Sequence, residues 1–199
     1  DGKWEKGKTR TGTASLLRDV IEAAEQKILA YINEKNPDLP EKELIARQIG
    51  ISALTFNDLK NRRLMDVKFD WDSALSFDGA TGPYVQNAHV RLCSIMRKAG
   101  YSVKLSEVNF SELTDDSAYE LIKLLARKGE KILSACEMEE PSVLAQYALE
   151  LSEAAHRFIH NDRVLGSAEE KSRLYLVQSA QCVMENVLDL LGLFPIRQM

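Results

Sequence analysis

The sequence predicts a mainly α-helical protein, in which a helical connector precedes a helical bundle. Apolar residues recur at steps of three and four along several long segments, which is the spacing of one buried helix face. Glycine and proline stand mostly between those segments, where helices begin or end. Only residues 65–72 alternate strictly between polar and apolar, so we expect at most one short extended segment.

Residues 1–14 are polar and rich in lysine, arginine and glycine, a composition typical of a loop that contacts phosphates or is simply solvated. They begin without a methionine and without targeting character, so we expect them to lie inside a longer protein.

Residues 15–72 are predicted to form the connector. The first helix runs over residues 15–34 and ends at Asn36-Pro37. A second helix is expected from Pro40 to Gly50, and a third over residues 52–61. The alternating residues 65–72 follow.

The bundle of residues 73–199 is organised around a helix that starts after the Asp78-Gly79 turn. Thr81 is in position to cap it, Pro83 fits its first turn and Gly100 is predicted to end it. One arc of this helix is apolar and is expected to face the core. Its members are Val85, Ala88, Leu92, Ile95, Met96 and Ala99.

The adjoining arc combines an aromatic ring, an amide and two cations: Tyr84, Asn87, Arg91, Ser94 and Lys98. Such a surface suits unpaired nucleotide bases, which stack on rings and guanidinium groups and offer their edges to amides. An ordinary solvated helix face is the alternative, because polar stripes are common on amphipathic helices.

Three further helices are expected to complete the bundle. A polar loop over residues 101–113 leads to a helix from a Thr114 cap to about Cys136, and Pro141 begins the next helix. The last helix spans residues 169–191 and is ended by Gly192 and Pro195. The residues expected to be buried in this last helix are Leu176, Ala180, Val183, Val187 and Leu190.

The charge, the apolar runs and the cysteines of the chain limit the classes of function that it can have. The formal net charge is −4, and the whole acidic excess lies after Asp72, which argues against a broadly basic nucleic-acid binder. The absence of a signal peptide and of a membrane-length apolar run predicts a soluble, cytoplasmic protein. The cysteines are Cys93, Cys136 and Cys182, which we expect to be small buried apolar residues in a reducing compartment.

His156 and His160 have a spacing that suits a metal on one helix face. The sequence offers no third ligand, so no metal site is predicted.

Several short motifs occur in a fixed order along the chain. They are Phe69-Asp70-Trp71-Asp72, Gly82-Pro83-Tyr84, Gln86, His89, Arg91, Arg163-Val164-Leu165, Leu190-Leu191-Gly192 and residues 195–199. Together they resemble the DALR-type anticodon-binding domain of class I arginyl-tRNA synthetases. The resemblance implies that residues 73–199 bind a tRNA anticodon and that residues 15–72 lie against the tRNA. By this resemblance Tyr84 and Met199 are candidate base contacts, and the polar arc of the helix adds Asn87 and Arg91. Members of the family often have tyrosine where Asn87 stands.

The run Thr9-Arg10-Thr11-Gly12 resembles the end of the KMSK loop of the same enzymes, with Lys6 at the first lysine and Gly7 and Lys8 in place of Met and Ser. The resemblance implies that Lys6, Lys8 and Arg10 stabilise the phosphates of ATP.

This resemblance implies the C-terminal part of an arginine–tRNA ligase, which attaches arginine to tRNA(Arg) with ATP and Mg²⁺. It implies a monomer whose arginine and ATP are held by an N-terminal domain with the HIGH signature, which this sequence lacks, so that the piece alone holds no cofactor and is inactive. A stand-alone tRNA-binding module, the corresponding region of a cysteinyl-tRNA synthetase and a purely structural helical scaffold are the alternatives.

Overall fold

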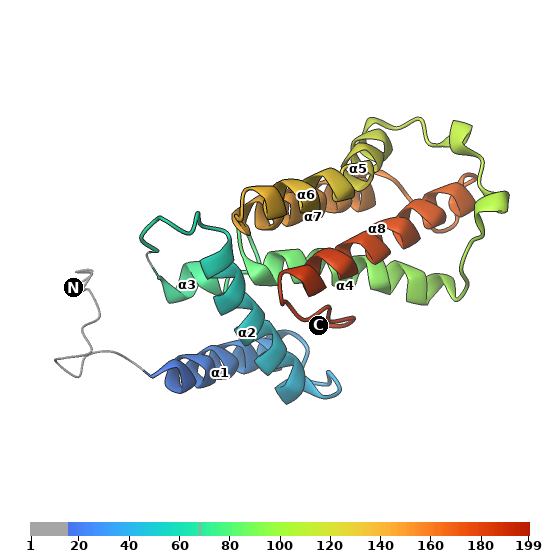
Figure 1. Ribbon diagram of the computed structural model, residues 1–199. Coiled ribbons are helices and arrows are strands. Elements are labelled where there is room, and N and C mark those ends of the chain that lie inside the picture. The colour runs from blue at the N-terminus through green and yellow to red at the C-terminus, as the bar shows by residue number, and fades with distance from the viewer. Residues whose placement is uncertain (1–15, 68) are drawn as a thin grey trace.

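The computed structural model describes residues 16–67 and 69–199, and within them all regular secondary structure is helical (Figure 1). The mainly α-helical fold is therefore confirmed. The α-helices are α1 (Leu17–Lys35), α2 (Lys42–Leu59), α3 (Trp71–Ala74), α4 (Gly82–Ala99), α5 (Asp116–Ala126), α6 (Lys128–Glu137), α7 (Ser142–Asn161) and α8 (Glu170–Leu190), with two 3-10 turns at Leu105–Glu107 and Phe110–Glu112.

Helices α1 and α2 pack against each other as a hairpin on one side of the molecule (Figure 1). The prediction that a helix ends at Gly50 is wrong, because α2 continues through it to Leu59. A Cβ atom at Gly50 would lie 3.1 Å from the backbone nitrogen of Glu25 and 3.2 Å from Ala24. The glycine therefore serves the close approach of the two helices and not the end of one.

The segment between α2 and α4 forms no strand among its described residues, and Trp71 and Asp72, at the end of the possible extended segment 65–72, are helical. It contains the short helix α3, whose start is fixed by Asp70: its Oδ1 accepts hydrogen bonds from the backbone nitrogen and the hydroxyl of Ser73 at 2.8 and 2.7 Å. An aspartate cap of this kind satisfies a backbone donor in the first turn.

Helix α4 is central and packs against α2, α7 and α8 (Figure 1). Its predicted boundaries are confirmed: Thr81 accepts a hydrogen bond from the Tyr84 backbone nitrogen at 3.2 Å, and Gly100 ends the helix with φ 74°. Val85, Ala88 and Leu92 are fully buried, as the apolar arc predicted.

The single helix predicted over residues 114–136 is two helices, and this expectation is corrected. Arg127 leaves the helical conformation with ψ near 0°, and Asp115 takes the cap position in place of Thr114. The Leu124 carbonyl oxygen accepts hydrogen bonds from the Arg127 backbone nitrogen at 3.1 Å and from the buried Tyr147 hydroxyl at 2.9 Å. In a continuous helix this carbonyl would accept a hydrogen bond from within the helix, whereas here it accepts one from α7 as well.

Helices α7 and α8 supply much of the core. The apolar side of α7 is buried from Leu144 to Phe158. In α8 the expectation is wrong for Leu190, which is 56% exposed, whereas Met184 and Leu188 are fully buried. Cys93 is buried as expected, but Cys136 and Cys182 are exposed.

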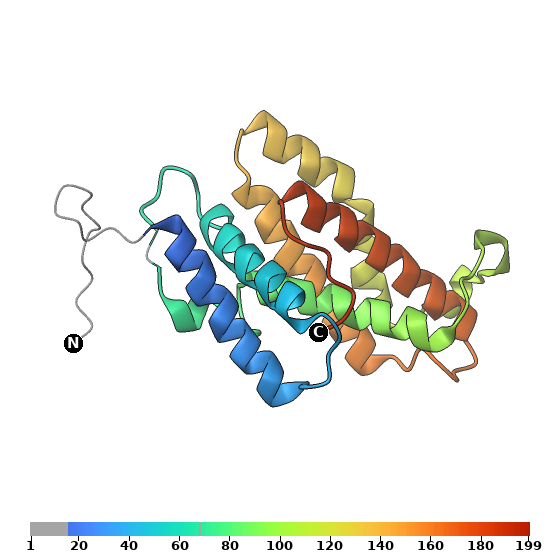
Figure 2. The same cartoon turned by 90° about the horizontal axis from the view of Figure 1, so that it is seen from below.

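After α8, Gly192 turns the chain with φ 68° and residues 193–199 return beside α4, toward the α1–α2 hairpin (Figure 2). Leu193 and Ile196 are buried in this segment. In the part of the chain that the structure describes, no helix combines the length and apolar character needed to cross a membrane.

Candidate functional site

The side of α4 next to α7 carries the residues that the sequence singled out. Tyr84 and Asn87 are half-buried there and Arg91 is exposed, so the three side chains share one accessible strip of the helix. We call this strip, with Ser94 and Lys98, the α4 polar face.

Tyr84 lies at the start of the α4 polar face, beside an open cavity of about 260 Å³. The cavity is also lined by Gly79 and Ala80, from the turn before α4, and by Leu149 and Glu153 of α7. Partial burial, followed by the negative charge of Glu153, raises the pKa of the Tyr84 hydroxyl above 10.0. The ring therefore remains a neutral phenol at physiological pH, with a polar hydroxyl on an apolar plane.

Helix α7 adds a residue that the sequence analysis did not assign to this surface. The His156 ring lies 5.1 Å from the Tyr84 ring, and its Nδ1 is 2.9 Å from Nη1 of Arg91. A guanidinium group can only donate, so Nδ1 of His156 accepts and the imidazole is neutral with its proton on Nε2. His156 thereby holds the Arg91 side chain beside the Tyr84 ring.

The sequence draws attention to His156 only through its four-residue spacing from His160. In the structure His160 is exposed, and no group of three metal-ligating side chains forms among residues 16–67 and 69–199. No sequence pattern indicates the pairing of His156 with Arg91, because the crossing of α4 and α7 decides which residues meet.

The environment of His156 lowers its pKa below 6.5, first through burial and second through the positive charge of Arg91. The neutral form is therefore favoured in the folded state, so its stabilising contribution is full above the unfolded pKa of 6.5 and is lost as pH falls from there through the lower pKa of the folded state. We expect wild-type protein to lose more stability than a His156→Gln variant between about pH 7.5 and about pH 5.5. Urea unfolding at several pH values measures this difference, and equal losses would contradict it.

Residues 193–199 reach the other side of α4. Nε2 of Gln86 donates to the Phe194 carbonyl at 2.8 Å, and Nδ1 of His89 lies 2.8 Å from the Ile196 carbonyl, to which it donates. Met199 is hydrogen-bonded to the end of α1, because Nδ2 of Asn36 donates to the Met199 carbonyl oxygen at 3.3 Å.

The Met199 side chain packs on the smaller apolar cluster between α1 and α2, as Val90 of α4 does. Met199 therefore lies toward the Val90 side of α4, whereas Tyr84 and Arg91 face α7. The structure brings the three predicted base contacts of α4 together on one helix and Met199 to its flank. Lys6, Lys8 and Arg10 fall outside the described residues.

This surface has a definite chemical character. It offers an aromatic plane, an amide and a guanidinium group within two turns of one rigid helix. Aromatic and guanidinium planes stack on unpaired bases, and the amide donates to and accepts from base edges.

Comparison with known proteins agrees with this chemistry. Residues 85–199 match the family model described as the DALR anticodon binding domain. Residues 1–71 match the model described as tRNA synthetases class I (R), catalytic domain.

Similar curated proteins include arginine–tRNA ligases. One from Bacillus cereus is 42% identical over 193 residues, which are 96% of this chain and 34% of the relative. That of Latilactobacillus sakei is 39% identical, over 98% of this chain and 34% of the relative. The chain thus spans about a third of the length of the relatives that it matches.

Solved structures give the same result. The Thermus thermophilus arginyl-tRNA synthetase superposes with a TM-score of 0.87 at 37% identity, over 95% of this chain and 33% of that one. The Plasmodium falciparum arginyl-tRNA synthetase gives a TM-score of 0.77 at 26% identity, over 92% of this chain and 32% of that one. The family model covers more than half of this chain and includes α4 from Val85 onward, α7 and the returning C-terminal segment, so the chain belongs to the DALR anticodon-binding domain family.

Proposed function

We propose that residues 73–199 bind the anticodon of an arginine tRNA and that the chain is the C-terminal part of an arginine–tRNA ligase. The observation that carries the proposal is the α4 polar face, which presents Tyr84, Asn87 and Arg91 together. The matched anticodon-binding domain begins at residue 85, directly after Tyr84, and includes the other residues of this face. The names of the similar proteins support arginine as the amino acid.

Each residue has a proposed role at this surface. Tyr84 stacks on a splayed anticodon base, and Arg91, oriented by His156, supplies positive charge and a second flat surface. Asn87 bonds to a base edge. Met199 contributes an apolar contact from the neighbouring flank of α4.

The rest of the chain is assigned from the family. Residues 15–72 are the connector that lies against the tRNA, and residues 1–14 are the remnant of the loop in which Lys6, Lys8 and Arg10 meet ATP. The ATP-dependent attachment of arginine to tRNA(Arg), with Mg²⁺ at the nucleotide, is proposed for the whole ligase. This chain supplies RNA binding to that reaction, as a monomer.

Binding of the chain to an arginine tRNA, compared with the same tRNA carrying a replaced anticodon, tests the proposal. We expect clear preference for the native anticodon at one stated salt concentration. In a Tyr84→Ala variant the affinity for native tRNA should fall by about 1–3 kcal/mol, because one base loses its stacking surface. Tyr119→Ala, which removes an exposed tyrosine on α5, is the matched control and should bind as the wild type does. Unchanged affinity of a folded Tyr84→Ala protein would exclude the assignment.

Deletion of Met199 tests its contribution separately. We expect the preference for the native anticodon to shrink more than binding to the anticodon-replaced tRNA, because the residue lies beside α4 and its apolar side chain can contact a base but cannot bind a phosphate. Binding assays with both RNAs measure this ratio. Equal loss on both would assign Met199 to the fold alone.

A further inference from the structure

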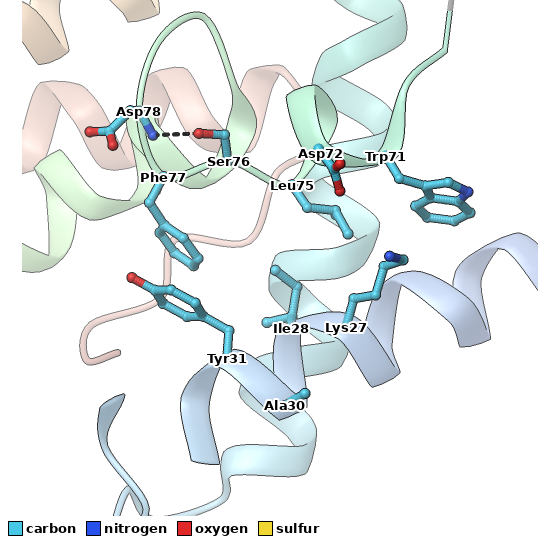
Figure 3. A pocket seen from close by; sticks show the side chains of 10 residues that line it. All are labelled: Lys27, Ile28, Ala30, Tyr31, Trp71, Asp72, Leu75, Ser76, Phe77 and Asp78. Atoms are coloured by element: carbon cyan, nitrogen blue, oxygen red, sulfur yellow. Dashed lines mark hydrogen bonds between the residues drawn. The ribbon is translucent and has the colours of Figure 1, made fainter. Parts of the chain in front are cut away.

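A second open site lies away from the α4 polar face, between α1 and the segment that leads into α4 (Figure 3). It is a cavity of about 510 Å³, the largest of those described. Ile28 and Leu75 form its aliphatic floor, Trp71 stands on one side and the Phe77–Tyr31 pair on the other (Figure 3).

The aromatic rings of this cavity are held in fixed orientations. Tyr31 and Phe77 stack with ring centroids 4.5 Å apart and planes inclined by 17°. Trp71 meets the edge of Phe69 at 4.9 Å with planes inclined by 83°. Because neighbouring rings already fix these planes, a flat ligand that stacks on them causes little further loss of conformational entropy. Trp71 and Phe77 are only half-buried, and Tyr31 is 39% exposed.

A cation stands next to these rings. The Lys27 ammonium lies 5.9 Å from the centre of the Trp71 ring, and no carboxylate pairs with it in the described ranges 16–67 and 69–199. Asp72 and Asp78 also line the cavity. Two carboxylates disfavour a phosphate inside it, so the cavity suits a flat, uncharged ring whose charged backbone remains outside within reach of Lys27.

A further open cavity, of about 420 Å³, lies between this site and the start of the α4 polar face. It shares Asp72, Ser76 and Asp78 with the first cavity and Ala80 with the cavity beside Tyr84. Phe77 also packs on the same apolar cluster as Val90 and Met199. A nucleic acid bound along α4 therefore passes this second site.

We propose that the cavity between Trp71 and Phe77 holds an unpaired base of the bound tRNA from outside the anticodon, with Lys27 at the adjoining phosphate. This inference rests on the proposed function and extends it to the connector. The exposed aromatic planes offer the base a stacking surface, and stacking is sequence-tolerant because every base has a flat face. The site therefore adds affinity without adding anticodon preference.

The experiment measures binding of the chain to native and to anticodon-replaced arginine tRNA for wild type, Trp71→Ala and Lys27→Met. Both variants are expected to bind both RNAs more weakly, with a roughly tenfold loss for Trp71→Ala, and to keep the wild-type ratio between them. Tyr119→Ala and Lys123→Met are the matched controls, because Lys123 lies 5.3 Å from the Tyr119 ring in a similar exposed pair on α5. These controls should leave both affinities unchanged.

Dimethyl sulfate probing of the bound tRNA gives a second readout. An unpaired adenine or cytosine outside the anticodon should be protected by wild-type protein and left reactive by Trp71→Ala. A circular-dichroism melt establishes that each variant is folded, and Tyr31→Ala replaces Trp71→Ala if the latter is not.

The outcomes separate the two proposals. If wild type prefers the native anticodon but the folded cavity variants bind as wild type does, the cavity assignment is wrong and the proposed function stands. If wild type shows no anticodon preference while the cavity variants still lose affinity for both RNAs, the proposed function fails and the cavity is an RNA site. If wild type binds neither RNA, both proposals are overturned.

Discussion

Gly82→Ala is expected to destabilise the fold by about 2–3 kcal/mol, because it overpacks the junction of α4 and α2. A Cβ atom at Gly82 would lie 2.7 Å from the carbonyl oxygen of Ser52 and 3.1 Å from the Cα of Ala53. These are backbone atoms in the middle of α2, so no side-chain rotation relieves the overlap. The two helices must instead move apart, which loosens their buried contact.

Urea unfolding of the wild type and the Gly82→Ala variant measures this loss. Gly129→Ala is the matched control, because Gly129 lies within α6 and a Cβ there meets nothing within 4 Å. That control should be stabilised by about 0.5–1 kcal/mol through the better helix propensity of alanine. The same Gly→Ala change should therefore lower the free energy of unfolding at Gly82 and raise it at Gly129. An unchanged free energy of unfolding for Gly82→Ala would contradict the close packing of α4 on α2.

His89→Ala should cost about 2–4 kcal/mol of folding free energy. The ring is fully buried, and its loss leaves both a cavity and a buried Ile196 carbonyl without its 2.8 Å partner. Burial lowers the pKa of His89 below 6.5, although the backbone hydrogen bond to Ile196 opposes the shift. The neutral ring is thus part of the native fold at physiological pH.

The same variant should also loosen residues 193–199. Limited proteolysis should cut this segment faster in His89→Ala than in wild type, since one of its anchors to α4 is gone. His160→Ala is the control, because that ring is exposed on α7. A stability loss below about 1 kcal/mol, with unchanged proteolysis, would show that Gln86 and the apolar contacts hold the segment without His89.

The sequence predicted well those helices whose boundaries are determined by residues at the helix ends themselves. Helix α4 is the best case, since Thr81, Pro83 and Gly100 act on their own backbone and its apolar arc follows the helical period. Gly50 shows the limit: the same residue type that ends α4 lies within α2, because its role depends on α1 crossing there. The break at Arg127 was missed for a similar reason, as it is accompanied by a hydrogen bond from Tyr147 on another helix.

The candidate site was predicted in part. Tyr84, Asn87 and Arg91 share a face by helical geometry alone, so the sequence was sufficient to group them. His156 joins them from 65 residues away, and its partner is decided by how α7 crosses α4. Met199 reaches α1 and the flank of α4 only because Gly192 reverses the chain and Gln86 and His89 bind the returning carbonyls.

The returning segment also has a consequence for the order of folding. Its hydrogen bonds join Gln86 to Phe194 and Asn36 to Met199, which are 108 and 163 residues apart, whereas α1 and α2 are neighbours in sequence. Closing such long loops is entropically costly until the intervening helices are in place. We therefore expect the hairpin to form early and the docking of residues 193–199 to come last, so that the flank of α4 proposed to meet RNA is completed only in the final step of folding.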